Sequence, residues 1–534
     1  MSPRTPAGRA PAWIFALTLA AALGMGVAGY TGRPAYTDAY YYYNAAARLR
    51  AGAGLTDPYV ALTYLGAQAR LPQPSHLYWM PLTSLVIAPG VGSPFPWPAA
   101  CLWAGLAALA AWCGAARPGG GGLGAMRRHA WAAGLLVIFS GFYAPFWLQP
   151  DSFALYGVVG ALALIGIGLG RTRRDWRWFA FGGAMAGLAH LTRADGMLLA
   201  AVLALAAAWP GPSSPSTSET SGATWRARAM HAGAGLLAYA LVMTPWALRN
   251  LSVGAPPLPA SGAATMWLRS YDEIVNYPPD ALTFQRFLDW GLDNILASRW
   301  EALATNAQHF VAEQGLVVLW PFTLIGLWKR RRDPFLSGVW VYALALHAAM
   351  TFAFAYPGMR GGLFHSSTAL LPFWFSLGVC GIDDAVDWAA ARRRWNAAQA
   401  KRFFTVALVV IMAALTLSIL AARRPRMGSG NAPFDALNAL LPGDAVVMFN
   451  DPAALYYHTG RMGVVTPNGG AEMVRAIAER YGVTHVVLDV NRTAPLNDLY
   501  LDRAAVDFLR PVAVLYSEDG VPANDVRVFE VKLP

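Results

Sequence analysis

A series of apolar runs long enough to cross a membrane constrains this chain more than any other feature of its sequence. A hydrocarbon core about 30 Å thick is crossed by roughly 20 helical residues. Runs of that length occupy 12–30, 130–148, 152–170, 229–249, 335–356, 363–386 and 403–422, and shorter or interrupted runs occupy 79–116, 178–208 and 313–329. The 534 residues are 56% hydrophobic and 13% charged, which is more apolar surface than a water-soluble fold can bury. The sequence therefore predicts a mainly α-helical, polytopic membrane protein.

Short basic clusters between the apolar runs predict which side of the membrane each loop faces, because cytoplasmic loops carry an excess of Lys and Arg. Four clusters are expected to be cytoplasmic, namely Arg127-Arg128, Arg171 to Arg177, Lys329 to Arg332 and Arg392 to Arg402. The segments expected on the external side are 31–78, 149–151, 250–312 and 357–362. This arrangement requires about eleven spans, with a cytoplasmic N-terminus followed by an uncleaved first helix at 12–30.

The residues after 422 are expected to form a separate external domain, 423–534, attached to a transmembrane domain, 1–422. From Pro433 onward, short β-rich runs such as THVVLDV alternate with a helical pattern at 470–481. Such alternation is typical of a small α/β domain.

Three arginines at the start of this external part depart from the charge rule: Arg423, Arg424 and Arg426. Contact with lipid headgroups would explain them. The net charge of +11 does not indicate nucleic-acid binding, because the cations form short clusters between apolar runs rather than one continuous face. Nearly all basic residues are arginines and alanine is abundant, a composition typical of a GC-rich bacterial genome.

Asp38 and Asp151 are the candidate acidic groups on the external side. Asp38 opens TDAYYYYNAAARLRAG, a tyrosine-rich pattern that favours a helix lying in the membrane interface. Asp151 lies in FWLQPDSFALYG, where the chain turns back into the membrane. Each aspartate could simply cap the helix that follows it, which would not exclude catalysis. Two carboxylates on the same side nevertheless form a candidate acidic pair.

Arg193, Arg360 and His365 are candidate groups for binding an anion. Buried arginines in membranes either pair with a carboxylate or bind an anion such as a phosphate. Both interpretations remain open for Arg193, since Asp195 follows it closely in HLTRADG. Arg360 and His365 lie in YPGMRGGLFHSS, where two glycines would let a ligand approach the backbone. Arg360 is therefore the preferred phosphate ligand, with a headgroup contact as its alternative.

Several familiar catalytic motifs are missing from the sequence: a P-loop, HExxH, a nucleophile elbow and CxxC. The three cysteines, Cys101, Cys113 and Cys380, lie in apolar segments and provide no metal-binding spacing. Glycines at 166, 168 and 170 favour helix packing over a nucleotide loop. The residues require no cofactor or metal, although a carboxylate pair could hold a divalent cation.

The order of these motifs resembles the GT-C glycosyltransferases, and most closely the glycosyltransferase family 39 group. That group includes protein O-mannosyltransferases and the aminoarabinose transferases of lipid A. The resemblance rests on Asp38 before a tyrosine-rich helix, on Pro81-Leu82 in HLYWMPLTSL, on LQPDSFALYG and on AGLAHLTRADGMLL. It covers roughly residues 10–260 and, more loosely, the region from Arg360 to Pro372.

The chain departs from that family pattern at two places. Many members carry Asp-Glu in the first loop and Lys-Pro-Pro-Leu after it, whereas this chain has Asp38-Ala39 and Trp79-Met80-Pro81-Leu82. The missing Glu and Lys leave the contact to the donor phosphate without a family residue. Arg360, Arg193 or His76 could take that place.

The resemblance implies sugar transfer from a polyprenyl-phosphate donor to a lipid, glycan or protein acceptor, on the external face of the plasma (inner) membrane and with inversion. Asp38 would take the proton of the acceptor hydroxyl, and Asp151 would orient the acceptor or the partners of Asp38. Arg360 would stabilise the departing phosphate, with His365 or Arg193 in reserve. Two alternatives remain: a transporter or flippase, although the sequence shows no internal repeat, and a non-enzymatic scaffold that presents the C-terminal domain.

Overall fold

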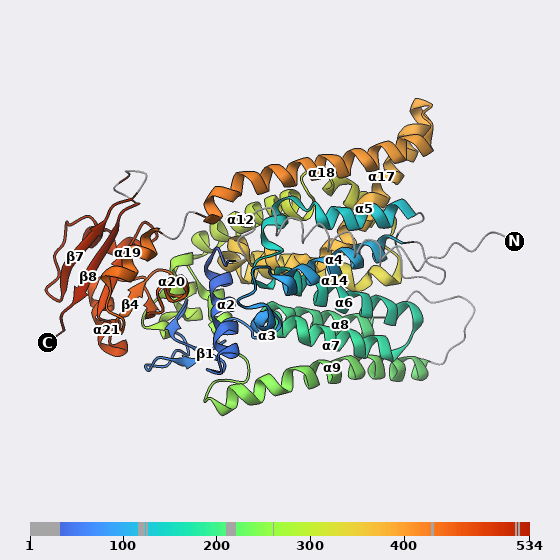
Figure 1. Cartoon of the computed structure of the whole chain (residues 1–534). Coiled ribbons are helices and arrows are strands. Elements are labelled where there is room, and N and C mark those ends of the chain that lie inside the picture. The colour runs from blue at the N-terminus through green and yellow to red at the C-terminus, as the bar shows by residue number, and fades with distance from the viewer. Residues whose placement is uncertain are drawn as a thin grey trace.

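The computed structural model describes residues 33–115, 123, 127–209, 221–259, 261–428, 432–517, 521 and 524–533. The first span expected at 12–30 lies outside these residues. Figure 1 shows a bundle of helices that run in roughly one direction, with a β-sheet at one end of it. This architecture confirms the predicted class, a helical membrane protein with a small C-terminal α/β region.

Six helical stretches in the described part of the chain are long and apolar enough to cross a membrane: Trp97–Gly114, Ser152–Arg173, Trp225–Ser252, Pro334–Ala353, Ala355–Arg393 and Ala397–Arg423. The predicted total of about eleven spans also counts shorter helices. Two of these are α7 (Trp176–Thr192) and α8 (Met197–Ala208). The number of crossings therefore stays a prediction.

Some helices of the bundle are buried in its interior, whereas others lie at its periphery and expose most of their surface. In the central helix α6 (Ser152–Arg173), 89% of the span is buried within the protein, whereas the corresponding shares are 17% for α9 (Ser221–Ser252) and 22% for α18 (Ala397–Gly428). Gly166 of α6 meets α7 so closely that an added Cβ would lie 2.8 Å from the Cα of Gly182. The glycine string in α6 is therefore a packing surface for a neighbouring helix.

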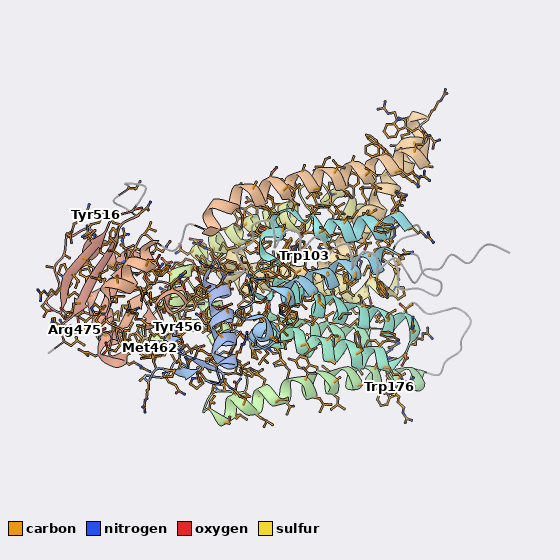
Figure 2. All side chains as sticks on the ribbon, viewed as in Figure 1. Trp103, Trp176, Tyr456, Met462, Arg475 and Tyr516 are labelled. Atoms are coloured by element: carbon orange, nitrogen blue, oxygen red, sulfur yellow. The ribbon has the colours of Figure 1, made fainter. Side chains whose placement is uncertain are left out.

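Three of the predicted basic clusters meet at one end of α17 (Leu371–Arg393). Arg128 pairs with Asp383, Arg330 Nη1 lies 2.8 Å from Asp384 Oδ2, and Lys401 Nζ lies 2.6 Å from Asp387 Oδ2. Trp176, inside the remaining cluster Arg171 to Arg177, lies at the far end of the molecule from Arg475 and Tyr516 of the C-terminal sheet region (Figure 2). The basic clusters and the C-terminal sheet are thus at opposite ends of the bundle.

The C-terminal sheet has the strand order β2-β5-β4-β6-β8-β7. Its parallel strands are β4 (Val446–Phe449), β5 (Met462–Val465) and β6 (His485–Leu488), and its antiparallel strands are β7 (Leu509–Leu515) and β8 (Val526–Val531). The helices α20 (Pro452–Thr459) and α21 (Ala471–Tyr481) connect the parallel strands, as the alternation in the sequence predicts.

The edge strand β2 (Tyr59–Val60) comes from the loop near the N-terminus rather than from the C-terminal region. It pairs in parallel with β5, where Tyr59 faces Gly463 and Val60 faces Val464. Two residues give no readable periodicity, so the sequence does not predict this strand. The pairing joins the loop 31–78 to the C-terminal sheet.

Candidate active site

Asp38 lies in the first turn of α2 (Thr37–Arg50), and the N-cap of this helix is Tyr36 rather than Asp38. The side chain of Asp38 is therefore free to face the bundle, where it forms a hydrogen bond with the indole of Trp79. The tyrosines Tyr41 and Tyr42 are each 1% exposed, so α2 packs its aromatic face inside the protein.

Asp151 is both the N-cap of α6 and a member of the site. Its Oδ1 accepts a hydrogen bond from the backbone N–H of Ser152, and its Oδ2 accepts one of 2.7 Å from the hydroxyl of Tyr36. The capping role expected from the sequence is thus present. The bond to Tyr36, which directly precedes α2, ties the two acidic segments together.

Asp38, Asp151 and His365 share one cluster. One carboxylate oxygen of each aspartate and one imidazole nitrogen of His365 all lie within 4.8 Å of one another. His365, on α16 (Leu363–Ser366), has Nδ1 3.9 Å from Asp151 Oδ1 and 3.1 Å from Ser152 Oγ, and its ring stacks on Phe153. The two carboxylates named from the sequence therefore lie together, as a shared site requires.

The environment of Asp38 makes it a base that titrates near neutrality. Removal of its carboxylate from water, followed by the nearby charge of Asp151, raises its pKa to about 7. The charge of Arg193 and the hydrogen bond from Trp79 act in the opposite direction. Desolvation also raises the pKa of Asp151, although the hydrogen bonds from Tyr36 and Ser152 oppose this.

Arg193 forms an ion pair with Asp195, one of the two interpretations that its sequence context left open. Its Nε lies 3.2 Å from Asp195 Oδ1 and 3.1 Å from Ser366 Oγ, and the Ser366 hydroxyl also bonds to Asp195. Because the positive charge of Arg193 still lowers the pKa of Asp38, it contributes to the field at the acidic pair.

Arg360 and Asp38 share one neighbour, the aromatic ring of Tyr271. It belongs to the π-helical turn η10 (Gly358–Gly362), in which Gly361 has a φ of 125° that favours glycine. Its guanidinium carbon is 5.1 Å from the ring centroid of Tyr271. Desolvation and then the charge of Asp38 raise the pKa of Tyr271 to about 12, which places this ring near both residues. Within the described ranges, Arg360 has neither a hydrogen bond nor an ion pair.

The structure does not bring His76 to the acidic pair through any described contact. Its ring lies 2.7 Å from Ser75 Oγ and 3.1 Å from Ser84 Oγ, and its backbone N–H donates to the hydroxyl of Tyr41. Burial lowers its pKa to about 3, so the imidazole is neutral at pH 7.

Two residues near Asp38 were not identified from the sequence. Trp79 donates to Asp38 and stacks on Tyr41 at a centroid distance of 4.2 Å. Asp451 caps α20 and accepts a 2.7 Å hydrogen bond from Thr37 Oγ1, and its charge raises the pKa of Asp38. The motif Asn-Asp-Pro at the start of a helix was the available signal for Asp451. The C-terminal region thus supplies a third carboxylate near the pair.

No protein-family model and no curated protein matches the chain, but solved structures do. The archaeal oligosaccharyltransferase AglB from Archaeoglobus fulgidus, in complex with an inhibitory peptide and a dolichol-phosphate, matches with a TM-score of 0.53 and 13% identity, over 96% of this chain and 73% of that one. The same protein in complex with Zn and sulfate matches with a TM-score of 0.51 and 13% identity, over 97% and 73%. ArnT from Cupriavidus metallidurans, bound to undecaprenyl phosphate, matches with a TM-score of 0.50 and 15% identity, over 97% and 98%.

These identities are too low to transfer an activity, but the coverage includes both the helical bundle and the C-terminal sheet. AglB and ArnT are both GT-C membrane glycosyltransferases. The chain therefore shares its overall fold with AglB and ArnT.

Proposed function

We propose that this protein is a membrane glycosyltransferase that moves a sugar from a polyprenyl-phosphate carrier to an acceptor hydroxyl. The main support is that Asp38 and Asp151, which are far apart in the sequence, have carboxylate oxygens within 4.8 Å of each other in a GT-C-like fold. Structures of AglB and ArnT hold a dolichol-phosphate and undecaprenyl phosphate, which supports a lipid-linked donor. The acceptor is a lipid, a glycan or a protein.

The reaction is a single displacement. The acceptor oxygen attacks the anomeric carbon, the bond from that carbon to the phosphate oxygen breaks, and polyprenyl phosphate leaves with the bonding electrons. The acceptor proton passes to the carboxylate of Asp38, which later releases it to solvent. Attack opposite the leaving group inverts the anomeric carbon. Asp151, held by Tyr36 and Ser152, positions the acceptor, and its charge adds to the desolvation that raises the pKa of Asp38.

The leaving phosphate gains negative charge in the transition state and therefore needs nearby cations. Arg360 is the preferred ligand, because its guanidinium has no hydrogen bond or ion pair among the described residues and contacts Tyr271, a ring that also feels the charge of Asp38. Arg193 is bonded to Asp195 and acts through its field, while His365 lies against Asp151.

The cluster of Asp38, Asp151 and His365 also fits a divalent cation. Its two carboxylates and one imidazole are ligands that Zn²⁺ and Mn²⁺ accept, and their donor atoms are close enough to share one ion. Such an ion would supply Lewis-acid stabilisation of negative charge. The reaction described above does not depend on it.

The function is tested with purified protein in lipid nanodiscs and a panel of polyprenyl-phosphate sugars. We expect release of free polyprenyl phosphate, measured by mass spectrometry, together with a glycosylated acceptor whose anomeric configuration is opposite to that of the donor. Consumption of a nucleotide sugar, or a product that retains the donor configuration, would contradict the proposal.

We further propose that the basic end of the bundle is cytoplasmic and that the C-terminal sheet lies outside the plasma (inner) membrane. The support is the convergence of three basic clusters on the acidic residues of α17, at the end opposite the sheet. An alkaline phosphatase reporter fused after residue 534 is expected to be active. A fluorescent protein that folds only in the cytoplasm should stay dark at the same position, and bright fluorescence there would reverse the orientation.

A further inference from the structure

Arg423 is a cation at an unusual place, the sheet end of α18. That helix has only 22% of its span buried in the protein, so most of its surface faces lipid. The sequence leaves Arg423 on the side of the membrane where arginines are less frequent. A contact with peripheral headgroups would be expected to point the side chain away from the bundle.

The face of α18 that carries Arg423 instead packs against the protein. Met412 and Thr416 are 0% and 1% exposed, and Thr416 Oγ1 accepts a 3.0 Å hydrogen bond from the backbone N–H of Gly141. Arg423 follows Thr416 by seven residues, which returns it to nearly the same face of the helix. Its guanidinium carbon lies 5.3 Å from the ring centroid of Phe146, at the end of η2 (Gly141–Phe146).

Two aromatic residues in contact with each other, Phe146 and Tyr36, connect Arg423 to the acidic pair. The ring of Phe146 meets the ring of Tyr36 edge-on at 5.6 Å, and Tyr36 donates its 2.7 Å hydrogen bond to Asp151. Phe153 and Phe364 contact Phe146 at 4.9 and 5.3 Å and complete an apolar wall. In the part of the chain that the structure describes, no carboxylate pairs with Arg423. The guanidinium of Arg423, which has no described carboxylate partner, therefore lies where α18 packs against the apolar wall beside the acidic pair.

We propose that Arg423 binds the phosphate of the polyprenyl-phosphate carrier on the Asp151 side of the site. The inference rests on the proposed function and extends it, because it assigns a second phosphate ligand in addition to Arg360. The planar guanidinium matches two phosphate oxygens at once, and the apolar wall keeps water from competing for them. Because α18 faces lipid, the polyprenyl tail can stay in the membrane while its phosphate reaches Arg423.

The test measures lipid binding rather than catalysis. Purified protein in an uncharged detergent is titrated with undecaprenyl phosphate, or separately with phosphatidylglycerol, and bound lipid is counted by native mass spectrometry. Arg423→Gln is expected to weaken undecaprenyl phosphate binding about tenfold, as loss of a charge-assisted contact does. Arg423→Lys should recover only part of the affinity, since it keeps the charge and loses the planar fork.

Arg392→Gln is the matched control. Arg392 also lies over an aromatic ring, with its guanidinium carbon 4.3 Å from the centroid of Trp388, but it belongs to a basic cluster at the opposite end of the bundle. This variant should bind undecaprenyl phosphate like the wild type. The lipid-free melting temperatures of both variants should match that of the wild type, which separates lost binding from lost folding.

Two results would overturn the proposal. Equal undecaprenyl phosphate binding by Arg423→Gln and the wild type would show that Arg423 does not hold the carrier. An equal loss of phosphatidylglycerol binding would show a general headgroup site instead. Failure of the wild type itself to bind undecaprenyl phosphate would reject the donor class of the proposed function, and this outcome is distinguishable from failure of Arg423 alone.

Discussion

Replacement of Asp38 by Asn is expected to lower kcat/KM for sugar transfer by about 10²- to 10⁴-fold, because the acceptor loses the carboxylate that is placed to take its proton. Asparagine has nearly the same shape, and its side-chain oxygen can still accept the hydrogen bond from Trp79. The variant should therefore fold, insert into the membrane and bind the donor lipid. The measurement is the initial rate of polyprenyl phosphate release over a series of donor concentrations.

Asp435→Asn serves as the control for this experiment. Asp435 is an exposed aspartate in the first turn of α19 (Ala432–Leu440), on the same end of the molecule as the site. It should keep wild-type activity. A fully active Asp38→Asn protein would remove Asp38 as the base. A scaffold would tolerate the neutralisation of both Asp38 and Asp151, so the double variant separates that alternative from catalysis.

The pH profile gives a second readout of the same group. The carboxylate form of Asp38 is the active base, and its pKa is raised to about 7, so activity should increase as the pH rises through neutrality. Asp151→Asn removes a negative charge that raises the pKa of Asp38. The rise in activity should then move to lower pH, whereas a purely structural role for Asp151 would lower activity without moving the profile.

Replacement of Arg360 by Gln is expected to lower kcat by about 10²- to 10³-fold, the usual effect of removing one group that stabilises transition-state charge. The KM for the donor should change much less, because the phosphate gains its extra charge only as the glycosidic bond breaks. Single-turnover kinetics with a saturating polyprenyl-phosphate sugar would separate the chemical step from product release.

Two further variants make this result interpretable. Arg360→Lys retains the charge without the planar fork and should fall between the wild type and the glutamine variant. Arg331→Gln removes a guanidinium whose carbon lies 4.2 Å from the ring centroid of Trp328, within a basic cluster far from the site, and should leave kcat unchanged. A normal kcat in Arg360→Gln would shift the phosphate contact to Arg193 or Arg423.

Sequence patterns identified the parts of the fold that local physics determines. The length of the apolar runs predicted the membrane helices, and the alternation of strands and helices predicted the C-terminal α/β region. The charge rule placed the basic loops on one side of the membrane, and three of these loops form ion pairs with α17. The same rules placed Asp38 and Asp151 on one side of the membrane. They could not give the 4.8 Å spacing, because it depends on how α2 packs against the start of α6.

The contacts missed from the sequence all join residues far apart in the chain. Thr37 and Asp451 are separated by 414 positions, and no local pattern links a threonine at a helix start to an aspartate at another helix start. In the sequence, Trp79 was only a departure from a family motif. Its hydrogen bond to Asp38 is a feature of the three-dimensional structure. For His76 the sequence suggested a contact with the donor phosphate. In the structure its partners are Ser75, Ser84 and Tyr41, in a buried hydrogen-bond network.

The pairing of β2 with β5 has a consequence for how the protein is made. The segment that carries Asp38 leaves the ribosome long before two of its anchors, Gly463 opposite Tyr59 and Asp451, which lies 414 positions after Thr37. These two contacts can therefore form only after the apolar helix that ends at Arg423 has been synthesised. Until then Asp38 lacks the nearby carboxylate of Asp451, so the complete site should form late, after the C-terminal region has been synthesised.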